Sequence, residues 1–255
     1  MLNHLRRGSG RPVLLVHGLG SRLEVWDAIA DRLAASREVI AVDLPGFGSS
    51  ARFGPDRTPD PPGLARAVAD FLDEIEVPAP RVVGNSLGGT VALELGRLGR
   101  VSSVLCVSPA GFPAAWERRL LNLSLRMNRR VGTMPTPVHR MLARRPLRFL
   151  ALGQVSANPG RVCRTDALRA LEGLRLASDY DRTRRGLLSY RLENPHEIKV
   201  PVTIAWGTKD HLTLPGGMAR AASLLPQARI VALEGSGHVP MWDDPDRLTG
   251  LILAD

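Results

Sequence analysis

The sequence contains few cysteines, few lysines and few aromatic residues, and it has no long hydrophobic run. Two cysteines, Cys106 and Cys163, are too few for a disulfide framework or a cysteine metal site. We expect Cys106 to be a buried core thiol and Cys163 to be inert. No apolar stretch reaches the roughly 18 residues that would span a bilayer. Residues 1–12 also lack the apolar segment of a secretory signal, so a cytoplasmic protein is expected.

The positive charge of the chain is concentrated in one segment. The 255 residues have a formal net charge of +9, and only two of the basic residues are lysines. Residues 112–195 contain 17 Arg against 6 Asp or Glu, so this segment carries +11 and the rest carries −2. Three interpretations are open: a solvated surface, attraction of an anionic substrate, and peripheral contact with an anionic membrane. Nucleic acid is not expected as a partner, because the chain has only 11 aromatic side chains and no evident recognition module.

Short apolar runs typical of buried strands alternate with stretches that have helical spacing. The expected strands are residues 12–17, 38–43, 81–85, 101–107, 201–206 and 229–233. The expected helices are residues 25–35, 64–75, 87–98, 215–225 and 245–253. This rhythm predicts an α/β fold with a mostly parallel sheet flanked by helices. Few residues precede the first of these strands, so any leading antiparallel hairpin must be short.

The segment between the fourth and fifth expected strands has a different pattern. Leu, Met and Arg recur at helical intervals and no strand-like run interrupts them. We therefore predict a core formed by residues 1–111 and 196–255, with an inserted helical cap at residues 112–195. Such a cap would roof a pocket, and its Leu, Met and Phe side chains suggest a small-molecule substrate with an apolar acyl or aromatic group.

A serine flanked by glycines stands between an expected strand and an expected helix. Residues 84–88 (GNSLG) match the pattern G-x-S-x-G in the context that this pattern requires. Neighbours without Cβ atoms let the strand and the helix close around a sharp turn, which holds the serine hydroxyl at the carboxyl edge of the sheet. The N-terminus of the helix adds its dipole and free N–H groups. We predict that Ser86 is a nucleophile.

A serine nucleophile needs a general base to take its proton. Of the six histidines, His238 lies in the glycine-rich loop GSGH after the last expected strand, where it can reach the same sheet edge as Ser86. His17 ends a strand and is followed at once by glycine, so a structural role is expected for it. We predict that His238 is the base.

The base needs a carboxylate that fixes its tautomer and stabilises the imidazolium. Asp210 follows an expected strand by a short loop, and the order Ser86, Asp210, His238 is found among hydrolases with this type of serine turn. We predict that Asp210 is the acid. Of the other carboxylates, Asp43 is expected to fix a turn, and Asp243 and Asp244 are expected to cap the final helix.

A tetrahedral intermediate also needs donors for its oxyanion. The backbone N–H of Leu87 points there because of the sharp turn, and Leu19 in the sequence HGLG (17–20) can supply a second N–H. Trp26 and Trp242 are candidates to line the pocket, with core packing as the alternative. We expect no metal and no organic cofactor.

Five motifs in order resemble the α/β-hydrolase superfamily: HGLG at 17–20, DLPGFGSS at 43–50, GNSLGG at 84–89, WGTKD at 206–210 and GSGHVP at 235–240. The resemblance covers both halves of the predicted core, about two thirds of the chain. It implies a serine hydrolase that forms an acyl-enzyme. Epoxide hydrolases and haloalkane dehalogenases resemble this pattern but have Asp at the nucleophile position, so the resemblance argues against both.

Several activities remain open at this point. Hydrolysis of a carboxylic ester is the favoured one, with thioester or perhydrolase chemistry as variants. GNSLGG is also similar to the GNSMGG turn of meta-cleavage-product hydrolases, which cut carbon–carbon bonds and would place a cap arginine against the substrate carboxylate. A ligand receptor with the same fold is the alternative from another class. The sequence does not indicate an oligomeric state.

Overall fold

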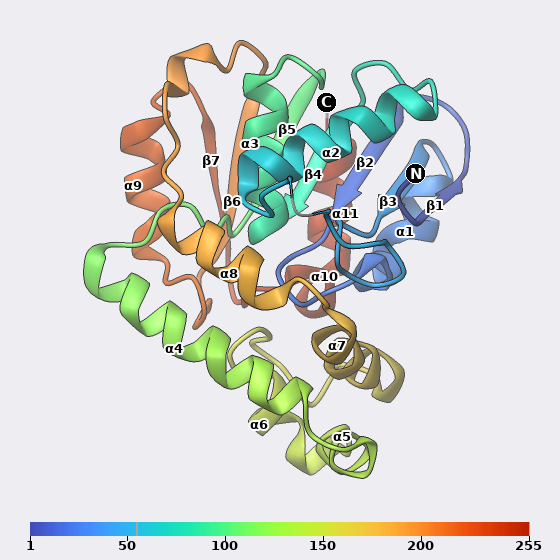
Figure 1. Ribbon diagram of the computed structural model, residues 1–255, viewed down its shortest axis with the longest axis vertical. Helices are drawn as coiled ribbons and strands as arrows, with labels where there is room; N and C mark the ends of the chain where they lie inside the picture. The colour runs from blue at the N-terminus through green and yellow to red at the C-terminus, as the bar shows by residue number, and fades with distance from the viewer. Residues whose placement is uncertain (55, 255) are drawn as a thin grey trace.

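A seven-stranded sheet forms the centre of the protein in the computed structural model, which describes residues 1–54 and 56–254 (Figure 1). The strands are β1 (His4–Arg7), β2 (Pro12–Val16), β3 (Glu38–Val42), β4 (Arg81–Asn85), β5 (Ser103–Val107), β6 (Val202–Gly207) and β7 (Arg229–Leu233). Their order in the sheet is β1-β3-β2-β4-β5-β6-β7. β1 runs antiparallel to β3, and the other neighbouring pairs are parallel. The predicted α/β fold with a mostly parallel sheet is confirmed.

Helices cover both faces of this sheet, which explains why the inner strands are apolar along their whole length. The flanking helices are α1 (Asp27–Ala34), α2 (Pro61–Glu74), α3 (Leu87–Arg97), α9 (Gly216–Leu224) and α11 (Pro245–Leu253). Because side chains alternate along a strand, Leu14 and Val16 of β2 belong to the core cluster that α2, α3 and α9 share. Val13 and Leu15 belong to the cluster shared with α1 and α11.

The short strand β1 does not form a hairpin with the next strand in the sequence. β2 pairs with β3 on one side and with β4 on the other, so neither of its edges is free. β1 therefore pairs with β3, with His4 opposite Val42 and Arg7 opposite Val39. The short leading segment thus forms strand β1, which is one edge of the sheet.

The chain between β5 and β6 forms a layer of helices beyond the carboxyl ends of the strands (Figure 1). These are α4 (Ala115–Gly132), α5 (Thr136–Leu142), α6 (Arg148–Leu152), α7 (Arg164–Leu176) and α8 (Tyr180–Ser189), with short 3₁₀ turns η2 (Arg145–Leu147) and η3 (Pro195–Glu197). We refer to α4–α8 as the cap helices, and they lie within the segment predicted to be a cap. Part of this layer has a small apolar cluster of its own, formed by Ala143, Leu152, Val162 and Ala167.

The longest cap helix, α4, has 18 residues and two unlike sides. Leu121 and Leu125 are buried, whereas three arginines (Arg119, Arg126 and Arg130) and several large apolar side chains on the other side are exposed. Such a helix is amphipathic rather than apolar all round. Within residues 1–54 and 56–254, no helix combines the length and hydrophobicity that crossing a membrane requires.

Candidate active site

Ser86 occupies a strained turn between β4 and α3. Its backbone has φ 58° and ψ −115°, a conformation that a residue with a side chain seldom adopts and that costs about 1–3 kcal/mol. Its N–H donates to the carbonyl of Val107 at 2.9 Å, which ties the turn to β5. A Cβ atom at Gly84 would lie 2.0 Å from the carbonyl oxygen of Gly88, and one at Gly88 would lie 2.1 Å from that of Val16. The two glycines are therefore what lets the strand and helix close around Ser86.

His238 and Asp210 form a buried hydrogen-bonded pair in two loops that follow β7 and β6. His238 Nδ1 lies 2.8 Å from Asp210 Oδ2, and the two residues are 3% and 1% exposed. The other oxygen, Oδ1, accepts the backbone N–H groups of Leu212 and Thr213 at 2.8 Å each. Since an ionised carboxylate only accepts, the proton on the ring belongs to Nδ1. Nε2 is then left with its lone pair, as a general base requires.

The hydroxyl of Thr213 also contacts this pair, a contact that the sequence analysis does not predict. It donates to Asp210 Oδ2 at 2.7 Å, and it lies 3.0 Å from His238 Nδ1 and 3.3 Å from the carbonyl of Ser108. The spacing D-x-x-T, with backbone N–H groups returning to the aspartate, is the signal that could have indicated it. Thr213 therefore holds the carboxylate of Asp210 in place beside the His238 ring.

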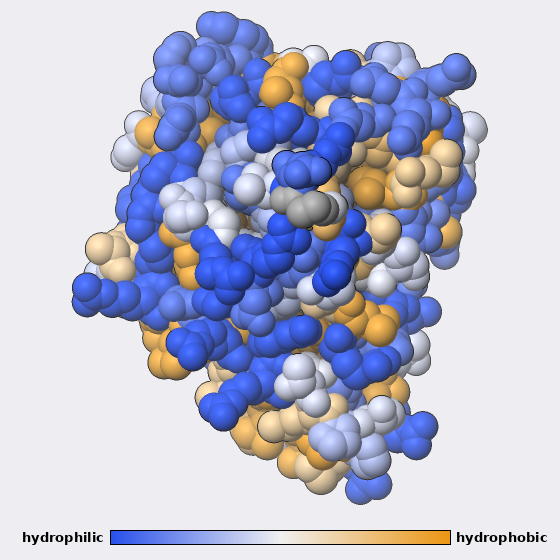
Figure 2. Space-filling view, viewed as in Figure 1, coloured by the Kyte–Doolittle hydropathy of each residue, from blue (hydrophilic) through white to orange (hydrophobic). Residues whose placement is uncertain are grey.

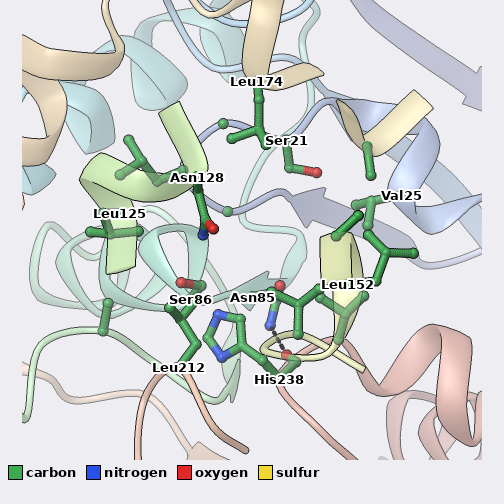
Figure 3. Close-up of a pocket in the computed structure, with 18 of the residues that line it drawn as sticks. Ser21, Val25, Asn85, Ser86, Leu125, Asn128, Leu152, Leu174, Leu212 and His238 are labelled. Carbon is green, nitrogen blue, oxygen red and sulfur yellow. Dashed lines mark hydrogen bonds between the residues drawn. The ribbon is translucent and has the colours of Figure 1, made fainter. Parts of the chain in front are cut away.

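Asn85 fixes the loop that carries His238. Its amide Nδ2 donates to the backbone carbonyl of His238 at 2.9 Å (Figure 3). The same Nδ2 also donates to the carbonyl of Val107 at 3.1 Å. The residue before the nucleophile therefore connects the loop after β7 to the centre of the sheet. Position 85 is part of the G-x-S-x-G pattern, but that pattern leaves its residue type open.

Asp243 was expected to cap the final helix, and this prediction is wrong. Asp244 is the residue that caps α11, because its side chain accepts the N–H of Arg247 at 3.1 Å. Asp243 instead accepts the N–H of Gly237 at 2.8 Å and the hydroxyl of Ser156 at 2.8 Å. It therefore joins the His238 loop to the cap, a contact between residues too distant in sequence to be predicted.

His17 organises the loop at the end of β2. Its Nδ1–H donates to the carbonyl of Gly18 at 2.7 Å, and its Nε2 accepts the N–H of Leu44 at 3.0 Å. The ring is completely buried, and this burial lowers its pKa although the nearby Asp43 carboxylate acts in the opposite direction. His17 is thus neutral and structural, as predicted. Asp43 fixes the adjacent turn by accepting the N–H of Ser49 at 2.9 Å.

The two predicted oxyanion donors belong to backbone segments next to Ser86. A Cβ atom at Gly18 would be 3.2 Å from the Cβ of Ser86, so the loop backbone that leads to Leu19 runs directly against the serine. Leu87 begins α3 immediately after it. Within the described part of the chain, neither backbone N–H is used in a hydrogen bond. Both remain available to a ligand.

The same loop packs tightly against the cap helices. Gly20 has φ 74°, and a Cβ atom there would lie 2.5 Å from Leu174 of α7 and 2.7 Å from the ring of Tyr180 of α8. A Cβ atom at Gly173 would lie 2.9 Å from the carbonyl oxygen of Gly20. The loop that carries Leu19 is therefore in direct contact with α7 and α8, and the side chains of Leu174 and Tyr180 pack against its backbone at Gly20.

Ser86 and His238 face one cavity, of about 100 Å³, between the sheet and the cap helices. In Figure 3, the His238 ring lies beside Ser86, and Asn128 points toward them from α4. Apart from Ser21, Asn85 and these three residues, the described lining is apolar: Leu19, Val25, Ala110, Leu121, Leu125, Val131, Ala151, Leu152, Val155, Ala170, Leu171, Leu174, Leu187, Leu212, Val239 and Trp242, with Gly18 and Gly20. No charged residue in the described part of the chain lines this cavity.

Of the two tryptophans predicted to line the pocket, the structure places only Trp242 in its wall. Trp26 is 0% exposed and packs in the core with Leu15 and Ile29, so the prediction for it is wrong. Successive residues of a 3₁₀ helix point about 120° apart, because it has three residues per turn. Because Val25 faces the cavity, the next residue in the 3₁₀ turn η1 (Leu23–Trp26) faces the core.

The remaining reactive side chains do not add a second centre to the cavity. Among the residues that the structure describes, no group of three His, Cys, Asp or Glu side chains could hold a metal ion. Cys106 is completely buried, and this burial raises the pKa of its thiol, so it stays protonated. It is a core thiol, as predicted.

Comparison with known proteins places this geometry in context. The sequence profile of the Alpha/beta hydrolase family matches residues 13–250. The chain is 30% identical over 269 residues to an uncharacterized protein of Mycobacterium tuberculosis, covering 96% of this chain and 75% of that protein. It is 31% identical over 197 residues to the epoxide hydrolase EphH of the same species, covering 74% of this chain and 91% of that protein.

Solved structures are similar over nearly the whole chain. A membrane phospholipase A, described as a bacterial virulence factor, matches with a TM-score of 0.80 and 26% identity, covering 98% of this chain and 80% of the other. A thermophilic esterase from Thermogutta terrifontis matches with a TM-score of 0.72 and 22% identity, covering 98% and 91% of the two chains. The second likeness concerns the fold alone.

Proposed function

This chain belongs to the alpha/beta hydrolase family and is a hydrolase, and we propose that it is a serine hydrolase that cleaves a carboxylic ester of an uncharged, apolar substrate. One observation carries the proposal. Ser86 and His238 face a single cavity whose described wall has no charged residue, and His238 is hydrogen-bonded behind that wall to the buried Asp210.

The proposed reaction is acyl transfer to water. Ser86 Oγ attacks the ester carbonyl while His238 Nε2 takes the hydroxyl proton. The resulting oxyanion accepts the backbone N–H groups of Leu19 and Leu87. As the intermediate collapses, His238 gives its proton to the leaving alcohol and an acyl-enzyme remains. Water, deprotonated by His238, then attacks the acyl carbonyl, and the proton returns to Ser86 as the carboxylic acid leaves.

Asp210 acts through the histidine in this scheme. Its carboxylate fixes the tautomer with the proton on Nδ1 and stabilises the imidazolium that forms in each step. Two backbone N–H groups and the Thr213 hydroxyl hold the carboxylate in place. Rigid support of this kind keeps the base aligned throughout the reaction.

The wall of the cavity supports an apolar acyl or aromatic group as substrate. Most of it is aliphatic, and Asn128 and Ser21 are the two polar side chains that lie opposite Ser86 and His238 (Figure 3). Sites that bind small apolar molecules commonly combine such walls with a few polar groups that fix orientation. In this proposal Asn128 binds an ester oxygen or the alcohol that leaves.

The same wall counts against the alternative of carbon–carbon hydrolysis. That reaction would place a cap arginine against a substrate carboxylate, and none of the 17 cap arginines lines the cavity. It also counts against the interpretation that the basic cap attracts an anionic substrate into the site. The relative named as an epoxide hydrolase does not change this proposal, because Ser86 has a hydroxyl where the resemblance to epoxide hydrolases requires a carboxylate.

The test of the proposal is hydrolysis of p-nitrophenyl esters of increasing acyl length. Ser86→Ala should lose at least about 10³-fold of the rate, since the nucleophile and the base act as a unit. Ser223→Ala, which changes an exposed serine of α9, is the matched control and should keep the wild-type rate. A fluorophosphonate should label the wild type and the control at Ser86 but leave Ser86→Ala unlabelled.

Two results would contradict the proposal. Ester hydrolysis by Ser86→Ala at a rate near that of the wild type would show that Ser86 is not the nucleophile. Labelling of Ser86 without steady-state turnover of any ester would favour the ligand receptor instead.

A further inference from the structure

The outer side of α4 exposes a stripe of large apolar residues. These are Trp116, Leu120, Leu123 and Met127, which are 60%, 46%, 62% and 51% exposed. Their spacing of four, three and four residues places them on one side of the helix. We call these four residues the apolar stripe. A soluble surface does not require such a continuous row, and contiguous apolar patches commonly mark a contact with a partner or a membrane.

The neighbouring helices extend this apolar character at the same end of the molecule. Met134, Met141, Phe149 and Leu150, in or next to α5 and α6, are also exposed. Of the twelve exposed large hydrophobic side chains in the described residues, nine lie between positions 116 and 176. Figure 2 shows apolar surface among hydrophilic residues at the end formed by α4–α6. The exposed apolar surface is therefore concentrated on the cap helices.

The charge around the stripe has a single sign. Residues 118–165 contain 11 Arg and no Asp or Glu. Arg119, Arg126 and Arg130 follow one border of the stripe along α4, and all three are exposed. Arg140, Arg144 and Arg145 are exposed in and after α5. None of these six arginines forms an ion pair with a described acidic residue.

We propose that this face of the cap docks on the surface of an anionic phospholipid membrane. The apolar stripe would enter the boundary between headgroups and acyl chains, while the bordering arginines bind lipid phosphates. Tryptophan, as at position 116, suits this boundary because it has an apolar body and a polar edge. Of the three interpretations of the basic segment, this one alone accounts for the exposed apolar residues and the uncompensated charge together.

Other occupants fit the observations less well. A second copy of the chain would bring two faces of the same charge together, which is unfavourable. A nucleic acid would use the arginines but has no need of exposed Leu123 and Met127. The face therefore matches a surface that is anionic and apolar at once.

Docking would place the cavity next to the lipid. Leu121 and Leu125 of the same helix line the cavity on the side opposite the apolar stripe. Only the thickness of one helix, about 10 Å, then separates the membrane from the cavity. An apolar ester dissolved in the membrane could reach Ser86 without crossing bulk water. This consequence rests on the proposed function, whereas the docking itself does not.

The test uses the full chain and sedimentation with vesicles. We expect binding to phosphatidylcholine vesicles that contain phosphatidylglycerol, with weak binding to phosphatidylcholine alone and loss of binding at high salt. The double variants Trp116→Ser/Leu123→Ser and Arg119→Ser/Arg126→Ser should each lower the partition coefficient at least about tenfold. Leu224→Ser and Arg66→Ser change an exposed leucine and arginine of the core domain and should bind like the wild type.

Two further measurements keep the outcome interpretable. Both double variants, which we call the stripe variants, should hydrolyse a soluble p-nitrophenyl ester at the wild-type rate. This rate would show that they are folded. Ser86→Ala should bind vesicles like the wild type, so a failure of the proposed chemistry leaves docking intact. Docking is refuted by equal binding of the stripe variants and the wild type, by absence of binding to anionic vesicles, or by a stripe-dependent dimer or nucleic-acid complex formed in place of vesicle binding.

Discussion

His17 should make the folded protein less stable in mild acid. Both of its ring nitrogens are used by the neutral form, because Nδ1–H donates to Gly18 and Nε2 accepts the N–H of Leu44. A second proton would set an N–H group on the ring against the N–H of Leu44. Burial therefore lowers the pKa of His17, even though Asp43 Oδ1 lies 3.9 Å from His17 Nε2 and favours the charged form of the ring.

The sign and size of the effect follow from proton linkage. The pKa of a histidine in the unfolded chain is about 6.5. Below this pH, His17 therefore binds a proton in the unfolded chain but stays neutral in the folded protein. The slope of the free energy of unfolding against pH approaches about 1.4 kcal/mol per pH unit well below pH 6.5, and His17 has almost no effect on this free energy above about pH 7.5. A histidine that stays neutral in the folded protein lowers the free energy of unfolding by about 1.4 kcal/mol when the pH falls from about 7.5 to 5.5.

The assay is urea denaturation at several pH values in this interval, for the wild type and for His17→Gln. Glutamine offers Leu44 an acceptor oxygen but does not titrate, so the variant should lose about 1.4 kcal/mol less stability on acidification. His196→Gln, which changes an exposed histidine, should behave like the wild type. The reasoning is refuted if His17→Gln and the wild type lose the same stability. NMR of the His17 ring in the wild type provides a second readout, with Nε2 expected to stay unprotonated in mild acid.

Two further substitutions test the site. Gly88→Ala should destabilise the fold by about 3 kcal/mol or more in thermal unfolding, because its Cβ would lie 2.1 Å from the Val16 carbonyl oxygen, whereas Gly250→Ala has open space and should not. Equal melting temperatures for both variants would contradict the packing described for the turn. Thr213→Val should lower kcat about ten- to hundredfold with little change in KM, because the carboxylate of Asp210 loses a charge-assisted hydrogen bond. Thr213→Ser should recover most of the rate, and an unchanged kcat in Thr213→Val would remove the positioning role.

The core of the fold could be predicted because its physical signals are local. A strand buried on both faces reads as a continuous apolar run, as PVLLV at 12–16 does. Loops that follow parallel strands gather at one edge of the sheet. Because Ser86, Asp210 and His238 each follow an expected strand, the sequence was enough to predict that they lie near one another. The structure brings these three residues to one end of the sheet.

Other features of the site could not be predicted from the sequence. They depend on how a helix is rotated about its axis or on contacts between residues far apart in the chain. The choice between Val25 and Trp26 as the residue facing the cavity is a rotation of one helical position, which the sequence does not specify. The bond from Asn85 to the His238 carbonyl joins residues 153 positions apart. The same holds for Asp243, whose partner Ser156 lies in the cap.

The contact between Gly20 and the helices α7 and α8 has a consequence for protein engineering. Exchanging the helical insertion of one hydrolase for that of another is an obvious way to change substrate preference. In this protein the graft would also have to reproduce the shapes of Leu174 and Tyr180, because these side chains fill the space that a Cβ on Gly20 would occupy. A graft that leaves a void there would let the backbone around Leu19 shift, so turnover would fall along with any gain in selectivity.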